Sequence, residues 1–88
     1  LVSGAGAIKL PYYAKDVNIV ASGEADLAIL LDGKPVSQED SGADVVNGIV
    51  HTSESRLYNV VSTKDPGNHT VEIRISKPGF EIYTFTFG

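Results

Sequence analysis

Histidine and carboxylate side chains are the first candidates for chemistry in this sequence, because they bind metals and move protons. His51 and His69 are the two histidines. Neither has a carboxylate or a second histidine at the spacing of a metal site, which needs three or four converging ligands. Glu39, Asp40 and Asp44 form an acidic stretch that could offer oxygen ligands to Ca²⁺, but their spacing matches no EF-hand loop. We therefore interpret the stretch as a solvated loop, and we expect no metal and no other cofactor.

The sequence gives equally little evidence for a catalytic nucleophile. The chain has no cysteine, so it has no disulfide, no thiolate metal site and no thiol redox chemistry of its own. Serines are plentiful, but none lies in a G-x-S-x-G elbow, the turn that exposes the nucleophile of an α/β-hydrolase. The sequence therefore predicts a domain that is not an enzyme.

Aromatic side chains are the more informative class. An aromatic face with a polar tip can stack on a sugar ring, and Tyr13 and Tyr58 are the better candidates for such a platform. Tyr12 and Tyr83 are predicted to lie in the core, with their hydroxyls at its rim. Arg56 stands two residues before Tyr58, and arginine and tyrosine are both favoured in binding hot spots. We therefore take Tyr13, Arg56 and Tyr58 as the ligand or interface candidates.

Length and charge limit the partners of these side chains. The 88 residues are too few for two cores, which predicts a single domain over residues 1–88. Seven dispersed Lys and Arg residues and a net charge of −4 predict no nucleic-acid partner. The longest apolar runs, such as residues 27–31, are far shorter than the ~20 residues that cross a bilayer. We expect no membrane contact by this domain itself. Because the chain contains no Met and no signal-peptide pattern, we also expect it to be a piece of a longer protein.

The elements that must position the candidates follow a two-residue period. Residues 69–75 alternate between apolar and polar side chains, as a half-buried antiparallel strand does. Residues 25–31 form a second strand that ends at Asp32-Gly33, a dipeptide typical of type I′ hairpin turns, and residues 34–36 are its expected return strand. Pro11 cannot donate to a strand ladder, so the strand around it is predicted to lie at an edge or to contain a bulge.

Three further segments complete the strand prediction. Residues 56–62 alternate, and residues 64–69 combine Asp, Pro, Gly and Asn, which predicts a turn before the next strand. The final strand, residues 80–87, has an aromatic side that is large enough to be core. The side chains on this predicted core side are Tyr83, Phe85 and Phe87.

One long connection separates these strands. Residues 37–48 are acidic and irregular, and they are predicted to hold one helical turn near residues 44–47. No segment has the pattern of a longer amphipathic helix. Seven or so short strands separated by turn signals predict an all-β antiparallel sandwich, with either a jelly-roll or a Greek-key topology.

Several segments, in this order, resemble one known family. They are YYAKDVNIVA, ILLDGKPV, GADVVNG, SRLYNVV, HTVEIRI and KPGFEIYTFTFG. The family is the C-terminal domain of the DipZ-type thioredoxin-family and cytochrome c biogenesis proteins, and the similarity runs from about Ala7 to Gly88. The resemblance implies a sandwich like that of carbohydrate-binding modules, on the C-terminal side of a thioredoxin-like domain. It also implies an extracytoplasmic location, periplasmic or at the cell surface.

Two hypotheses follow for the function. In the first, the chain is a non-catalytic accessory domain of a thiol-disulfide oxidoreductase. It would dock on the upstream thioredoxin-like domain and help to present a carbohydrate or protein substrate. The resemblance implies that the redox cysteines lie in that upstream domain. In the alternative, the chain is a purely structural cap or spacer that binds no ligand.

Overall fold

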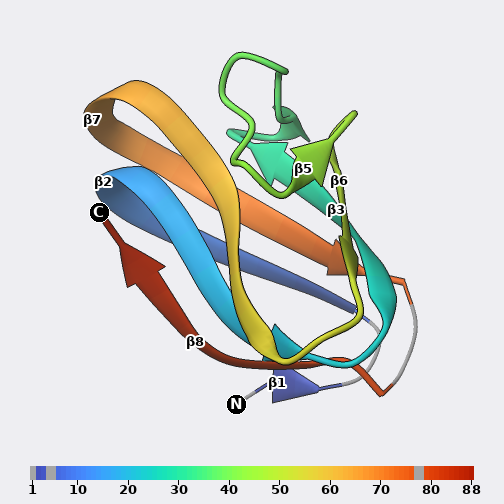
Figure 1. Ribbon diagram of the computed structural model, residues 1–88. Coiled ribbons are helices and arrows are strands. Elements are labelled where there is room, and N and C mark those ends of the chain that lie inside the picture. The colour runs from blue at the N-terminus through green and yellow to red at the C-terminus, as the bar shows by residue number, and fades with distance from the viewer. Residues whose placement is uncertain (1, 4–5, 77–78) are drawn as a thin grey trace.

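The computed structural model describes residues 2–3, 6–76 and 79–88, and their regular structure consists of β-strands alone (Figure 1). The strands pair antiparallel in one sheet with the order β1-β8-β2-β7-β3-β6-β5, and β4 pairs with β3. Their bounds are β1 Val2–Ser3, β2 Gly6–Ser22, β3 Ala25–Leu31, β4 Lys34–Pro35, β5 Val45–Val46, β6 Ile49–Thr52, β7 Arg56–Ile75 and β8 Glu81–Phe87. The predicted all-β class is confirmed. None of the described residues forms a helix long and apolar enough to cross a membrane.

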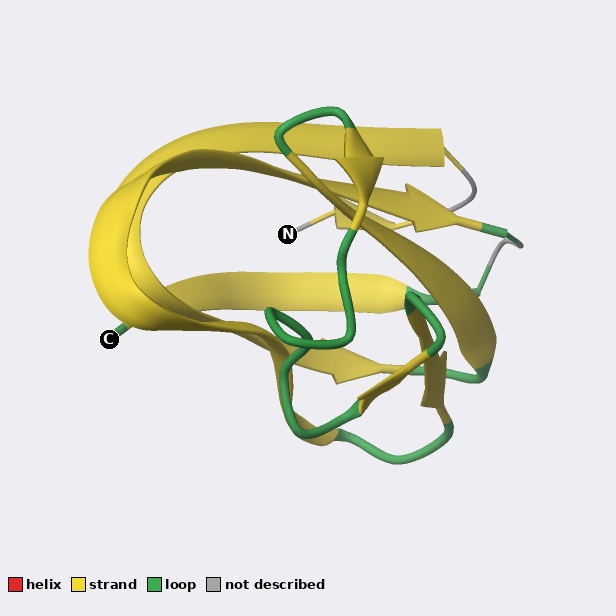
Figure 2. Cartoon of the chain, turned by 90° about the horizontal axis from the view of Figure 1, so that it is seen from above, coloured by secondary structure: helices red, strands yellow, loops and turns green. Residues whose placement is uncertain are grey.

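Two long strands, β2 and β7, carry the sheet through a bend (Figure 2). Their register passes from Ala14 opposite Gly67 to Asp16 opposite Ser62, so residues 63–66 bulge out opposite a single residue of β2. The turn predicted at residues 64–69 is therefore wrong: this segment bends β7 and does not reverse it. Bulges of this kind increase the local bend of a sheet. The two halves of the bent sheet face each other, as in a sandwich.

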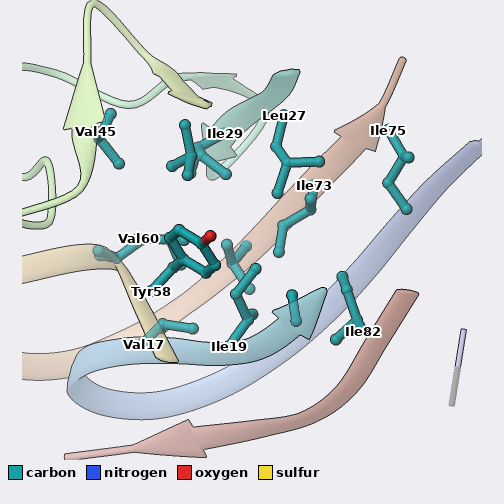
Figure 3. Packing of buried hydrophobic residues seen from close by; sticks show 14 of the residues in the cluster. Val17, Ile19, Leu27, Ile29, Val45, Tyr58, Val60, Ile73, Ile75 and Ile82 are labelled. Carbon is teal, nitrogen blue, oxygen red and sulfur yellow. The ribbon is translucent and has the colours of Figure 1, made fainter. Parts of the chain in front are cut away.

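The core lies between the two halves of the bent sheet (Figure 3). β8, the second half of β2 and the first half of β7 supply one side of it, and the first half of β2, the second half of β7, β3 and β6 supply the other. This arrangement explains the clean alternation seen in residues 69–75. Fully buried side chains from both sides include Val17, Ile19, Leu27, Ile29, Val50, Val60, Ile73 and Phe80.

The short hairpins use two-residue turns. Asp32 and Gly33 have φ values of 53° and 85°, as the predicted type I′ turn requires. Asn47 and Gly48 have φ values of 52° and 77° and connect β5 to β6 in the same way. The helical turn predicted near residues 44–47 is therefore wrong. An Asn-Gly pair accepts positive φ at low cost, and here it closes a hairpin.

The last strand departs from its predicted facing. Thr84 pairs with Val20, and Ile82 pairs with Ala21, so Tyr83 is an extra residue in β8. This bulge interrupts the two-residue alternation. Ile82 is buried, whereas Tyr83 and Phe87 are 49% and 43% exposed. The prediction that Tyr83, Phe85 and Phe87 share a core face is therefore wrong, although Phe85 does pack against the core.

Candidate functional site

Arg56 is the first residue of β7, and its guanidinium group is held by three contacts. It lies 4.0 Å from the centre of the Tyr58 ring. Its Nη2 donates to Asp44 Oδ1 at 2.9 Å, and its Nη1 donates to the carbonyl of Leu57 at 2.8 Å. The other carboxylate oxygen of Asp44 accepts from the backbone N–H of Asn59 at 2.8 Å. The loop before β5 and the start of β7 are thereby tied together.

The ion pair between Arg56 and Asp44 is partly open to solvent. The hydrogen bond from Arg56 holds the pKa of the Asp44 carboxyl below its usual value, and the same bond raises the pKa of Arg56. The Arg56 side chain is 45% exposed, against 24% for Asp44. A partner that offers a carboxylate or an aromatic face can therefore still reach the guanidinium group.

Tyr58 has a different position from the one a ligand platform needs. Only 1% of the residue is exposed, and its ring points into the core beside Val17 and Val60 (Figure 3). Its hydroxyl donates to the carbonyl of Glu54 at 2.7 Å and accepts from the N–H groups of Ser53 and Glu54, each at 3.2 Å. Tyr58 therefore presents no free ring face on which a sugar could stack. Tyr58 contributes to the surface only through the packing of its ring against the Arg56 guanidinium group.

Tyr13 lies apart from that pair. It is 66% exposed and stands opposite Asn68 in the pairing of β2 with β7. Arg56 stands opposite Ala21, on the other side of the bend. The sequence candidates therefore divide between two surfaces and do not form one site.

An open cleft of about 400 Å³ lies beside Pro11 and Tyr12 of β2. Three segments meet there: β2, the middle of β7 and the turn between β3 and β4. The strand register brings them together. β3 pairs with β7 up to Leu31 opposite Val71, so the next residue, Asp32, lies beside Thr70. The lining residues are Pro11, Tyr12, Asp32, Asn68, His69 and Thr70.

An Asp–His pair lines this cleft. His69 Nδ1 lies 2.7 Å from Asp32 Oδ2, and the other carboxylate oxygen accepts from the N–H of Thr70 at 2.8 Å. These hydrogen bonds lower the pKa of Asp32, with the bond to His69 having the larger effect. Asp32 also donates its own N–H to the carbonyl of Thr70 at 2.9 Å. The turn is thereby fixed against β7, and the carboxylate has a partner at each oxygen.

Tyr12 forms the inner wall of the cleft. Its ring stacks on Phe87 with 5.4 Å between the ring centres, and it lies 6.0 Å from the His69 ring. Its hydroxyl is buried and has no hydrogen-bond partner among the residues that the structure describes. Burial, followed by the charges of Asp32 and Asp40, raises the pKa of Tyr12 to about 12, so the phenol is neutral at ordinary pH.

Sequence reasoning missed the pairing of Asp32 with His69. The residues are far apart in sequence, and only the register of β3 with β7 brings them together. The positive-φ turn and the strand that begins at His69 were both recognised, but their relative position was not. His51 has a similar partner, because its Nδ1 lies 2.6 Å from Asp26 Oδ1 on β3. Within residues 2–3, 6–76 and 79–88, no three metal-ligating side chains gather in one place.

These observations define a class of protein: a small β-sandwich domain with a partly exposed arginine, stacked on a buried tyrosine, on one surface and a polar cleft on another. The chain belongs to the family described as the thioredoxin-like C-terminal domain, whose model matches residues 1–88. The resemblance inferred from the sequence is thereby confirmed.

Two curated relatives are similar over most of the chain. Protein DipZ of Mycobacterium bovis and protein DipZ of Mycobacterium tuberculosis are each 38% identical to it over 82 residues, which is 93% of this chain. The match covers 10% of each relative's length. The chain therefore corresponds to one small part of much longer proteins.

Proposed function

We propose that this chain is a non-catalytic accessory domain of an extracytoplasmic thiol-disulfide oxidoreductase, in which it docks on a thioredoxin-like domain of the same polypeptide. The observation that carries the proposal is the family membership of the whole chain, together with its small share of the relatives' length. The absence of cysteine agrees with it, since the thiol chemistry would belong to the neighbouring domain.

The outer face of the layer formed by β8, β2 and β7 supports docking near Arg56. Leu57, Val20 and Thr84 stand side by side across the three strands, and Leu57 is 48% exposed. Tyr83, the bulged residue next to Thr84 on β8, is 49% exposed. Arginine and tyrosine are enriched in interfaces, and charged residues are depleted at interface centres. We assign this neutral face, with Arg56 at its margin, as the docking surface.

Substitution of Arg56 tests the proposed docking in the chain joined to its thioredoxin-like domain. Arg56→Ala should increase hydrogen exchange along β7 and loosen the two domains, because a partly exposed cation is lost from the contact. Lys9→Ala is the matched control, since Lys9 is an exposed cation that lies 4.0 Å from Glu72 on the other layer. Leu57→Ser provides a second variant at the centre of the face. If Arg56→Ala and Leu57→Ser leave the contact between the domains as unchanged as Lys9→Ala does, the proposed docking surface is wrong.

The accessory role also includes binding of a carbohydrate or protein substrate. Among the sequence candidates, Tyr13 has the exposed ring that such binding needs, whereas Tyr58 acts through its support of Arg56. A purely structural cap is the alternative, and the well-filled core favours it as much as it favours a binding domain. Ligand titration separates the two, because a cap shows no localised response.

A further inference from the structure

We propose that the cleft between the β3–β4 turn and β7 binds a small, neutral, hydroxyl-rich molecule of the carbohydrate class. The inference rests on the proposed accessory function for its biological use, and it names both the site and the chemistry of the ligand. Asn68, Thr70 and His69 would form its hydrogen bonds, and the ring of Tyr12 would contact its apolar face, with Tyr13 beside Asn68 at the margin of the cleft.

The cleft presents polar groups that are not used within the fold. Asn68 is exposed, and neither its carboxamide nor the Thr70 hydroxyl forms a hydrogen bond within the described part of the chain. His69 is held through Nδ1 by Asp32, so its Nε2 remains as the second hydrogen-bonding atom of the ring. A carboxamide, a hydroxyl and an imidazole nitrogen include both donors and acceptors. Hydroxyl groups of a sugar also donate and accept, so they match this set.

The charge of the cleft favours a neutral ligand. Its lining contains no lysine or arginine, and the whole chain carries a net charge of −4, which disfavours phosphate and carboxylate ligands. Asp32 carries the one carboxylate among the lining residues, and each of its oxygens already has a hydrogen bond, from His69 and from the Thr70 amide. Less of its charge is therefore available to a cationic ligand.

The apolar surfaces of the cleft suit the C–H faces of a sugar ring. Pro11 and the ring of Tyr12 line it, and Tyr12 is supported from behind by Phe87. Tyr13 stands opposite Asn68 and is two-thirds exposed, and directly paired residues lie within contact of each other across a strand pair. An exposed tyrosine beside free hydrogen-bonding groups is a combination that ligand sites use for orientation.

The site is rigid before a ligand arrives. Asp32 donates its N–H to the carbonyl of Thr70, accepts from the Thr70 N–H at its side-chain Oδ1 and also holds His69, so the turn and the strand move as one unit. Binding then requires little ordering of the protein. Because the cleft is open, we expect a Kd on the order of 1 mM for a single short sugar.

An NMR titration of the ¹⁵N-labelled 88-residue chain tests the proposal. The probes are the neutral sugars maltotriose and cellotriose, with trigalacturonic acid as an anionic comparison. We expect a neutral trisaccharide to shift the amide signals of Tyr12, Asn68, His69 and Thr70, and trigalacturonic acid to leave them unmoved. The absence of a localised response to both neutral sugars would overturn the proposal, and so would equal or tighter binding of the anion.

Paired variants connect the response to the cleft. Asn68→Ala and Thr70→Val should each weaken binding about 2- to 12-fold, the equivalent of one hydrogen bond of 0.5–1.5 kcal/mol. Thr84→Val removes an exposed strand hydroxyl on β8 and should leave the Kd unchanged. Equal affinities for all three variants would place the ligand elsewhere and overturn the assignment. The titration is independent of docking at Arg56, so a failure of one proposal leaves the other standing.

Discussion

Tyr58 should stabilise the domain through its ring and, separately, through its hydroxyl. The residue is 1% exposed, and a fully buried aromatic side chain costs about 3–5 kcal/mol when it is replaced by alanine. A domain of this length has a free energy of unfolding of about 4–13 kcal/mol, so Tyr58→Ala should remove a large part of it. Tyr58→Phe removes only the hydroxyl, which has three hydrogen bonds to the backbone of Ser53 and Glu54. Both of these residues are exposed, and water replaces part of the loss, so we expect about 1–2 kcal/mol.

Urea and thermal unfolding, followed by circular dichroism, measure both effects. For a domain of this size, each 1 kcal/mol lowers the Tm by about 4–8 °C, so Tyr58→Phe should be clearly resolved from the wild type. Tyr83→Phe is the control, because Tyr83 is half-exposed and its hydroxyl has one hydrogen bond, to Ser22 Oγ at 3.0 Å. Its effect should stay within about 0.5 kcal/mol. Equal unfolding midpoints for Tyr58→Phe and Tyr83→Phe would refute the reasoning that gives Tyr58 a structural role.

Two further predictions concern the loop that precedes β5. Gly42→Ala should destabilise the chain by about 1–3 kcal/mol, because the added Cβ would overlap the backbone carbonyl of Asn59, whereas Gly79→Ala meets no neighbour within 4 Å and should cost only its positive φ, about 1–2 kcal/mol. If the two variants have equal m-values in urea unfolding and Gly42→Ala loses less free energy of unfolding than Gly79→Ala, the predicted clash at Gly42 is wrong. The folded-state pKa of Asp44 is lowered, so its contribution to stability is present above its ordinary value of 3.8 and is lost as the pH falls through the folded value. The stability difference between the wild type and Arg56→Ala should therefore shrink in acid, and a difference that persists unchanged down to the fully protonated range would argue against the ion pair.

Local sequence signals predicted much of the fold. The alternation of residues 69–75 gave the buried row Val71, Ile73 and Ile75, and Asp32-Gly33 gave the hairpin turn, because both depend on neighbouring residues alone. Pro11 was expected at an edge or in a bulge, and it lies at an edge, since β2 pairs with β8 only from Val17 onward. These features need no knowledge of distant contacts.

The errors arose where distant strands decide the outcome. Residues 64–69 contain every signal of a reversing turn, but β2 runs beside both ends of the segment and keeps β7 in one sheet. Tyr83 is displaced by a bulge that only the pairing with β2 defines. Of the candidate site, the exposure of Tyr13 and the pairing of Arg56 with Tyr58 were within reach of the sequence. The cleft was not, because it depends on the register between β3 and β7.

The continuity of β7 through the bend is the feature on which the core, the cleft and the separation of the two surfaces all depend. Nuclear Overhauser contacts in the isolated chain measure it directly. We expect cross-strand contacts between Ala14 and Gly67 and between Asp16 and Ser62, together with contacts between the rings of Tyr12 and Phe87. A reversing hairpin at residues 64–69, with Ser62 paired to His69 and no contact between Tyr12 and Phe87, would contradict the bent-sheet fold and the cleft that it builds.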